Sequence, residues 1–358
     1  MSSRTLLLEA PRQLALAETP SRPLHAGEVR LRALRSAISH GTELNLYRGT
    51  SPFGDRAFDR ELRAFVPAAQ NGAFPQRLGY ELVAEVSEVA DGVAGLAVGD
   101  VVHAGAPHGE EAVLDVAAAR SSTYPLVPLP AGLPPGRALF ASVGAVALQA
   151  VHDARPHLGD HVVVVGLGAI GLLAVQMARL AGAARVTAVD LDAGRRELAL
   201  ALGADAALDP ATAEGGTGAA LKRGPGGGAD VAIETSGAAA GLQDAIASAV
   251  LGGRVVAVGF YQGGADALRL GEEWHHNRLE LISSMGAWGA PHRAHPAWDR
   301  PRVMATVLDL LASGRVDVDA LPTRTFPFDQ AVEAYRWLDE HPNEAVKVAL
   351  TYDGPNPS

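Results

Sequence analysis

The alternation of apolar and polar positions divides the chain into three regions. Residues 1–142 contain short runs with strand periodicity, such as VRLRALRSAI, LVAEVSEVA and EEAVLDV, which glycine and proline interrupt. From 143 to 286, strand-like runs alternate with Ala- and Leu-rich helical stretches, a pattern typical of a parallel sheet with helices on both faces. The rest of the chain has mixed character, with helices predicted at 301–313 and 329–340 and a closing strand in AVKVALTY.

The predicted parallel sheet has strands at 161–165, 185–190, 231–235, 254–259 and 279–285. We therefore expect an α/β protein with two domains. The first is β-barrel-like and consists of residues 1–142 and 287–358, and the second is a doubly wound parallel sheet, residues 143–286. The Gly-rich segment 211–230 is expected to contain a flexible surface loop rather than a functional motif.

The segment between residues 51 and 76 predicts an inserted amphipathic helix, because Phe58, Leu62 and Phe65 recur at helical spacing. Such a helix would shape a pocket for a bulky substrate. Alternatively, it would cover hydrophobic surface or make an oligomer contact.

Composition excludes several classes of function. A chain of 358 residues with 48% hydrophobic content can bury a substantial core, and its net charge of -10 argues against a nucleic-acid partner. No signal-peptide core and no stretch of about 18 apolar residues is found, so we expect a cytoplasmic protein without a membrane span. Cysteine is absent, which excludes disulfides, a thiolate nucleophile and zinc sites built on sulfur.

The strongest motif is G-L-G-A-I-G, which includes Gly166, Gly168, Ile170 and Gly171. A lone G-x-G-x-x-G is weak evidence, but this one follows an apolar strand and opens directly into a helical stretch. In this setting the first glycine permits a tight turn, the second lets the backbone approach a pyrophosphate, and the third allows close packing of helix and strand. The helix N-terminus stabilises the negative charge. The motif predicts a dinucleotide-binding domain.

Asp190 indicates which dinucleotide is bound. It ends the second strand, at the distance from the glycines that is typical of a carboxylate binding the ribose hydroxyls. Such a carboxylate repels a 2′-phosphate, which favours NAD over NADP. Alternatively, Asp190 only caps the following turn. Arg195 could weaken the NAD preference, although we expect it to pair with Asp192 or to face solvent.

The domain order and three short segments resemble the medium-chain dehydrogenase/reductase superfamily, which includes the zinc alcohol and polyol dehydrogenases. The segments are H-G-T-E at 40–43, G-Y-E at 79–81 and F-A-S-V-G at 140–144. The resemblance covers nearly the whole chain and implies a GroES-like β-barrel catalytic domain, a Rossmann domain and an NAD-dependent oxidoreductase. It also implies a homodimer or homotetramer joined through the edge strand at 279–285.

The resemblance also implies where a catalytic zinc would lie, and the ligands there have changed. His40 stands where the family places a thiolate, Tyr80 where it places a histidine, and approximately Ser142 where it places a third ligand. A catalytic zinc needs three protein ligands from Cys, His and carboxylate, so no metal ligand is assigned here. A weak divalent ion held by His40 with Glu43 or Glu81 remains an alternative.

Without zinc, another group must polarise a carbonyl or accept a hydroxyl proton. We hypothesise that Tyr80 hydrogen-bonds the reacting oxygen while His40, whose ordinary pKa is about 6.5, relays the proton through Thr42. Alternatively, His40 and Tyr80 satisfy each other in a former metal pocket, and catalysis comes mainly from orientation of the hydride donor and acceptor.

Charged residues near these positions complete the candidate set. Glu43 and Glu81 take the places of family carboxylates near the metal, where they would set the His40 tautomer, hold an arginine or serve the structure; we count Glu81 as a candidate catalytic residue. Lys347 matches a basic residue that the family often places against the coenzyme pyrophosphate, and otherwise would be a surface lysine. His275 and His276 are neighbours in sequence and would make poor joint metal ligands.

Three functions fit the sequence. The first is a zinc-independent, NAD-dependent dehydrogenase of a secondary alcohol, in a sugar, cyclitol or natural-product intermediate. The second is an NAD(P)H-dependent reductase of an activated C=C bond, ranked lower because the enoyl and quinone reductases of the family lack an acidic residue at the position of Asp190. The third is a non-catalytic NAD-binding protein.

Overall fold

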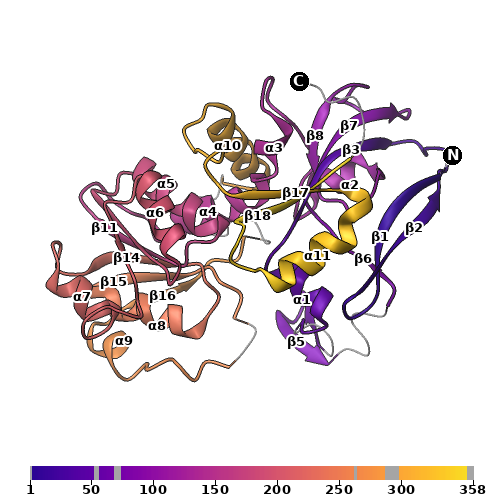
Figure 1. The fold of residues 1–358 in the computed structure, drawn as a ribbon. Coiled ribbons are helices and arrows are strands. Elements are labelled where there is room, and N and C mark those ends of the chain that lie inside the picture. The colour runs from indigo at the N-terminus through magenta and orange to yellow at the C-terminus, as the bar shows by residue number, and fades with distance from the viewer. Residues whose placement is uncertain (1, 52–55, 68–73, 262–263, 287–297, 353–358) are drawn as a thin grey trace. The chain divides into compact units, whose positions relative to one another are not determined.

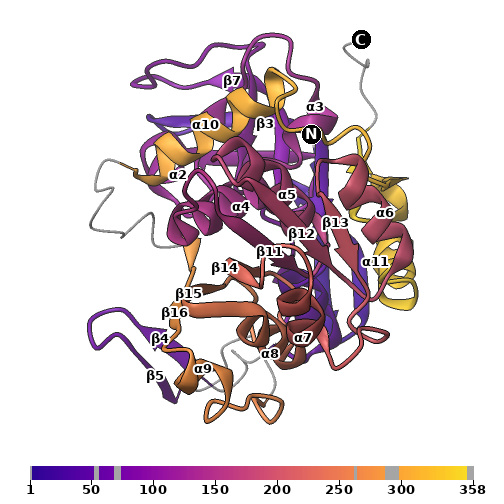
Figure 2. The same ribbon diagram turned by 90° about the vertical axis from the view of Figure 1, so that its left-hand side faces the viewer.

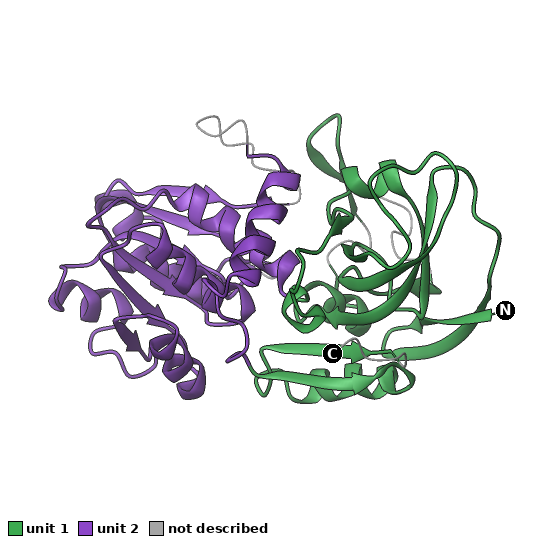
Figure 3. Cartoon of the chain, turned by 90° about the horizontal axis from the view of Figure 1, so that it is seen from above, with its two compact units in different colours: residues 1–139, 322–358 green, residues 140–321 purple. Residues whose placement is uncertain are grey.

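The computed structural model describes residues 2–51, 56–67, 74–261, 264–286 and 298–352. The chain divides into two compact units, residues 1–139 with 322–358 and residues 140–321 (Figure 3). The second unit therefore extends past the predicted boundary at 286 and includes the helix α10 (Arg300–Ala312).

The first unit is built largely from antiparallel strands. One sheet has the order β2-β1-β6, and a larger one has the order β10-β8-β7-β3-β18-β17, with β9 also paired to β3. The strands are β1 (Ser2–Ala10), β2 (Gln13–Pro20), β3 (Glu28–Ile38), β6 (Gln76–Arg77), β7 (Leu82–Val89), β8 (Val101–Ala104), β9 (Glu111–Asp115), β10 (Val127–Pro128), β17 (Thr323–Pro327) and β18 (Lys347–Thr351). The helices are α1 (Thr42–Arg48), α2 (Val116–Ser121), α3 (Pro135–Ala138), the 3-10 turn η2 (Phe328–Gln330) and α11 (Ala331–Glu340).

The end of the chain completes the core of this unit. Figure 1 shows α11 beside β17 and β18. Its buried residues Tyr335 and Leu338 pack with Leu6 and Leu8 of β1 and with Ile38 at the end of β3. The burial of these apolar side chains therefore fixes the end of β3, where the candidate residues begin.

The predicted helix around Phe58 and Phe65 is wrong. The described residues there form a hairpin of β4 (Arg56–Asp59) and β5 (Ala64–Pro67), in which Phe58 lies opposite Phe65 with ring centroids 5.3 Å apart. The spacing of these aromatics suits a helix as well as a short hairpin, and the cross-strand pair is the arrangement that forms.

The second unit contains the predicted parallel sheet, in the order β13-β12-β11-β14-β15-β16 (Figure 2). Its strands are β11 (His161–Val165), β12 (Arg185–Val189), β13 (Ala206–Leu208), β14 (Ala229–Glu234), β15 (Ala249–Ala257) and β16 (Glu280–Ser283). Its other helices are α4 (Ala141–Ala154), α5 (Ala169–Leu180), α6 (Ala193–Ala201), α7 (Thr217–Arg223), α8 (Ala239–Ser248) and α9 (Glu273–His276).

Helices cover both faces of this sheet. Figure 1 shows α4 and α5 on one face and α7 and α8 on the other. All five residues of β11 are buried, which explains why its sequence, HVVVV, is continuously apolar rather than alternating. The expected doubly wound α/β architecture is confirmed.

The Gly-rich segment 211–230 is more structured than expected. It contains α7, and the Gly228 carbonyl accepts a hydrogen bond from Nδ1 of the buried His161 at 2.7 Å.

Over the described residues, no helix is both long enough and apolar enough to cross a membrane.

Candidate active site

The candidate residues of the first unit gather at one end of its larger sheet. His40 lies two residues after the end of β3, while Tyr80 and Glu81 come just before β7. The two strands run antiparallel with Ser36 opposite Leu82, so the end of one meets the start of the other.

Two more residues lie at the same end. Lys347 begins β18, where Val348 lies opposite Ile38 of β3. Tyr124 lies before β10, and its carbonyl accepts the N–H of Gly105, which follows β8, at 3.1 Å. Segments far apart in sequence therefore meet where β3 ends.

The backbone at Gly79 sets the position of Tyr80. Gly79 has φ +110°, which disfavours side-chain-bearing residues, and a Cβ there would lie 2.5 Å from the backbone nitrogen of His108. The chain can therefore pass close to His108 only with glycine at position 79.

The Tyr80 phenol is suited to donate a hydrogen bond. Its pKa is raised well above the ordinary value, mainly because the surrounding protein desolvates the half-buried ring, and further because of Tyr124 and the carboxylates of Glu81 and Glu43. The Ser39 hydroxyl opposes the shift by hydrogen-bonding the phenol. Tyr80 thus stays protonated at neutral pH and is suited to be a hydrogen-bond donor rather than a base.

Tyr124 is a residue of this site that the sequence did not reveal. Its ring stacks on that of Tyr80, with centroids 4.3 Å apart and planes 16° apart. Burial, followed by the charge of Glu81, raises its pKa to about 12, and a hydrogen bond with Tyr80 acts in the opposite direction. No motif surrounds Tyr124 in S-S-T-Y-P-L, so only the pairing of β8 with β10 could have located it.

Lys347 is not a surface residue. It is 2% exposed, and its ammonium forms an ion pair with Glu81, which is 1% exposed. A buried charge requires such a partner, and each of these residues is the partner of the other. The imidazole of His103, on β8, is also buried, and burial followed by the charge of Lys347 lowers its pKa to about 4, opposed by a hydrogen bond with the Pro125 carbonyl.

Glu43 belongs to a buried network with His108 and Tyr335. Its Oε2 accepts hydrogen bonds from the Tyr335 hydroxyl at 2.5 Å and from His108 Nε2 at 3.0 Å, and its Oε1 accepts the Ser39 N–H at 3.3 Å. The other ring nitrogen of His108, Nδ1, shares a hydrogen bond with the Ser36 hydroxyl at 2.8 Å. The network ties the start of α1 to α11 and so holds the turn that carries His40.

The donor set does not fit a zinc ion. Glu81 is committed to Lys347 and Glu43 to His108 and Tyr335, while Tyr80 offers a protonated phenol. In the part of the chain that the structure describes, no group of three or more His, Asp or Glu side chains is placed to hold a metal. Ser142, the third position, is a buried hydroxyl of α4 in the second unit.

In the second unit, the glycine motif forms the expected turn. Gly166 has φ +87°, and a Cβ there would lie 2.6 Å from the Ser236 nitrogen. A Cβ at Gly171 would lie 1.9 Å from the Gly166 carbonyl oxygen, whereas one at Gly168 would meet nothing within 4 Å. Ile170 lies in the first turn of α5. The structure thus requires glycine for packing at 166 and 171, and leaves the backbone open to an approaching group at 168.

Asp190 binds two backbone N–H groups, which fits the predicted turn cap. Its Oδ2 accepts the N–H of Leu167, inside the glycine motif, at 2.6 Å, and its Oδ1 accepts that of Asp192 at 2.8 Å. It therefore caps the following turn and also lies against the motif, where a ribose would be bound. The Arg195 backbone N–H donates to Asp192 at 2.9 Å as part of the α6 N-cap.

The sequence did not reveal a second set of residues, which lies at the carboxyl end of β14. Glu234, at the end of β14, is fully buried and accepts hydrogen bonds from the Ser236 backbone N–H at 2.6 Å and from the Tyr261 hydroxyl. Burial raises its pKa, which the bonds from Ser236 and Tyr261 oppose. The cluster fixes the turn that packs against Gly166.

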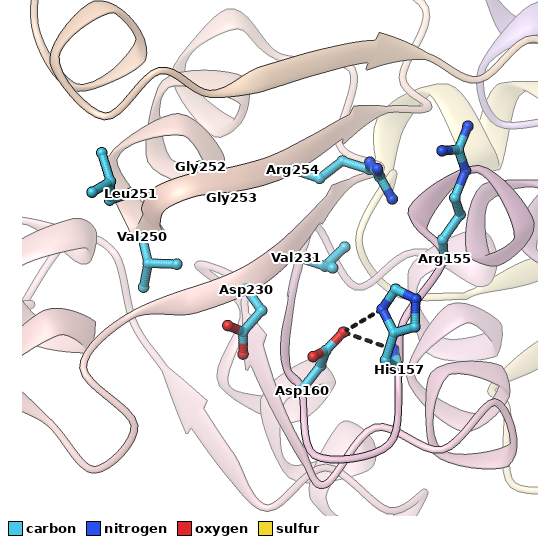
Figure 4. Close-up of a pocket in the computed structure, with 10 residues that line it drawn as sticks. All are labelled: Arg155, His157, Asp160, Asp230, Val231, Val250, Leu251, Gly252, Gly253 and Arg254. Atoms are coloured by element: carbon cyan, nitrogen blue, oxygen red, sulfur yellow. Dashed lines mark hydrogen bonds and ion pairs between the residues drawn. The ribbon is translucent and has the colours of Figure 1, made fainter.

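A hollow of about 230 Å³ lies near the amino-terminal ends of β11, β14 and β15, away from the strand ends that carry the glycine motif (Figure 4). It is lined by Arg155, His157, Asp160, Asp230, Val231, Val250, Leu251, Gly252, Gly253 and Arg254. Its charged groups are largely engaged: Asp160 accepts the His157 N–H at 2.7 Å, and Arg254 pairs with Glu280 at 2.7 Å. Ligands of such sheets bind at the carboxyl ends of the strands, so we do not assign a coenzyme to this hollow.

The chain is similar to known dehydrogenases. Residues 169–300 match the model of the zinc-binding dehydrogenase family, a stretch that begins after the positions 40–43, 79–81 and 140–144. The D-guloside 3-dehydrogenase of Escherichia coli (strain K12) is 34% identical over 357 residues, covering 98% of this chain and all of the relative.

Two solved structures share the fold. One, from Sinorhizobium meliloti 1021, is assigned as a zinc-binding dehydrogenase and is bound to NADP, with a TM-score of 0.76, 22% identity, and coverage of 98% of this chain and 99% of that one. The other, an alcohol dehydrogenase from E. coli CFT073 in complex with NADH, has a TM-score of 0.77 and 21% identity, with the same coverage. At this identity they establish the two-domain α/β fold, with its barrel and its Rossmann domain.

Proposed function

The chain belongs to the medium-chain alcohol dehydrogenase superfamily, and on that basis we propose that it is a zinc-independent dehydrogenase of a secondary alcohol in a sugar derivative. The observation that carries the proposal is the protonated phenol of Tyr80, which comes just before β7 and stands where the family has a zinc ligand. The D-guloside 3-dehydrogenase supports the substrate class, because position 3 of a sugar ring carries a secondary hydroxyl.

The glycine motif and Asp190 would hold the nicotinamide coenzyme. The pyrophosphate would lie against the open backbone at Gly168 and the N-terminus of α5, and the ribose against Asp190. When bound, the coenzyme supplies a nicotinamide ring that exchanges a hydride with the alcohol carbon. Asp190 favours NAD, while the fold by itself accepts either coenzyme, since one structure of this fold holds NADH and another NADP.

In this proposal, residues of the first unit transfer the hydroxyl proton of the substrate alcohol. In alcohol oxidation, Tyr80 donates a hydrogen bond to the substrate oxygen as negative charge develops there, which lowers the barrier. Thr42 is exposed at the first position of α1, next to His40, and passes the substrate proton to the imidazole. In the reverse direction the same groups return the proton to the carbonyl oxygen.

Glu81 and Lys347 support this chemistry indirectly, by stabilising the structure around Tyr80. Their ion pair is fully enclosed, so neither side chain is expected to bind substrate directly. We assign the pair a structural role: Glu81, just before β7, holds Lys347 at the start of β18, and Lys347 does not contact a phosphate directly.

The test is NADH formation from NAD, with excess chelator present, on a panel of glycosides, cyclitols and simple secondary alcohols. We expect turnover that persists after the metal content of the protein has been shown to be negligible. Loss of turnover in chelator, restored by zinc, would refute metal independence. Activity confined to NADPH and activated alkenes would favour C=C reduction instead, and silence on every substrate would favour a non-catalytic role.

A further inference from the structure

The phenol of Tyr80 has a neighbour of the same chemistry. Tyr124 stacks on it nearly in parallel, with ring centroids 4.3 Å apart and planes at 16°, and each phenol contributes to the pKa of the other. Close, nearly parallel stacking leaves each ring little freedom to rotate.

The backbone around Tyr124 is itself held in place. Its carbonyl accepts the Gly105 N–H at 3.1 Å and the Ser122 hydroxyl at 2.7 Å. A Cβ on Gly105 would lie 2.7 Å from the Tyr124 Cβ, so only glycine lets β8 approach this closely. Tyr124 is therefore presented to Tyr80 from a rigid loop.

The surroundings keep both phenols protonated. Burial and the carboxylates of Glu81 and Glu43 disfavour a phenolate at either ring. Two neutral phenols in contact can share one hydrogen bond, after which one hydroxyl proton remains available for a third oxygen.

Building on the proposed function, we propose that Tyr124 is a positioning residue for Tyr80: its ring and hydroxyl orient the Tyr80 phenol toward the oxygen of the substrate alcohol. The two phenols then act as one hydrogen-bond donor. The rigid loop at Gly105 fixes the position of this donor, as a metal ion fixes the substrate oxygen in related enzymes.

Two substitutions at Tyr124 separate ring from hydroxyl. Tyr124→Phe keeps the stacked ring and removes the phenol contact, so we expect kcat to fall about tenfold with KM for the alcohol and coenzyme affinity nearly unchanged. Tyr124→Leu removes both and should lower kcat further. The double variant Tyr80→Phe/Tyr124→Phe should be no slower than Tyr80→Phe alone, because the two residues act as a unit.

Tyr47→Phe is the matched control, since Tyr47 is a buried tyrosine that packs against another tyrosine ring, 5.5 Å away, outside this pair. It should leave kcat unchanged. Additive losses in the double variant, or an unchanged kcat in Tyr124→Phe, would overturn the proposal.

A measurement without turnover keeps this test separate from the proposed function. The chain has six tyrosines, so protein labelled with ¹³C at the tyrosine Cζ gives a small set of resonances that single variants assign. Because the Cζ shift reports hydrogen bonding of the phenol, Tyr124→Phe should move the Tyr80 resonance and Tyr47→Phe should not. An unmoved Tyr80 resonance would show that the phenols are uncoupled, even if the enzyme proves to act on another substrate.

Discussion

Tyr80 is the residue on which the proposed chemistry depends most directly. Replacing Tyr80 with Phe keeps the ring stacked on Tyr124 and removes the O–H donor, so we expect kcat for alcohol oxidation to fall about a hundredfold. Because the pKa of Tyr80 lies well above its ordinary value, the hydroxyl stays protonated throughout the working range. The ratio of wild-type to variant kcat should therefore stay constant from about pH 7 to about pH 10.

Steady-state rates at several pH values, with Tyr47→Phe measured in parallel, provide this ratio. A ratio that approaches one as the pH rises would mean that the phenol ionises in this range, contrary to the role assigned to it.

Two glycines of the same motif should respond in opposite ways. Valine at Gly168 places its side chain in open space and in an ordinary backbone conformation, so the melting temperature should hardly change. Coenzyme affinity should fall at least about tenfold, because the side chain occupies the place where the pyrophosphate approaches. Alanine at Gly171 instead forces a Cβ to 1.9 Å from the Gly166 oxygen and should destabilise the whole unit.

Calorimetry and titration of NADH fluorescence distinguish these two effects. If Gly168→Val bound NADH as tightly as the wild type, the coenzyme would have to be held elsewhere on the protein.

At the level of single elements, β8 should make folding stability depend on pH. His103 on this strand has a native pKa of about 4, against about 6.5 in the unfolded chain, so between these values the unfolded state binds a proton that the native state does not. Stability from this group is therefore complete above about pH 6.5 and declines as the pH falls toward 4, by about 3 kcal/mol in total.

His103→Gln retains an N–H that can reach the Pro125 carbonyl and removes the titration. We expect the free energy of unfolding of this variant, measured in urea at about pH 7 and about pH 4.5, to fall less than that of the wild type. Equal losses in the two proteins would place the imidazole of His103 in contact with water.

At the scale of the whole molecule, β16 is the last strand on its side of the parallel sheet among the residues that the structure describes. It pairs with β15 on one side, and Leu281 within it and Met285 just beyond it are 39% and 53% exposed. An unpaired strand with exposed apolar side chains is a surface that proteins cover. We therefore predict a homo-oligomer in which β16 contacts a second copy.

Light scattering coupled to size-exclusion chromatography tests this prediction. Leu281→Lys should shift the protein toward the monomer, whereas Leu158→Lys, at a leucine that is 92% exposed elsewhere in the second unit, should not. A wild-type monomer at all concentrations would contradict the prediction.

The sequence by itself determined the features that depend on local patterns. The buried strand HVVVV, the glycine motif and Asp190 lie close together in the chain, and their periodicity and spacing reflect direct backbone requirements. The prediction that His40 and Tyr80 stand where the family has zinc ligands likewise needs only residue identities at matched positions.

Only the tertiary structure showed which side chains meet. Tyr124 stacks on Tyr80, His108 binds Glu43, and Lys347 is enclosed with Glu81, because strands distant in sequence pair at one end of the sheet. Phe58 and Phe65 make the same point, since their spacing fits a helix and a hairpin equally well. Local periodicity either specifies the secondary-structure element or fits two elements equally well. Long-range packing decides which residues bury each side chain and which charges lie beside it.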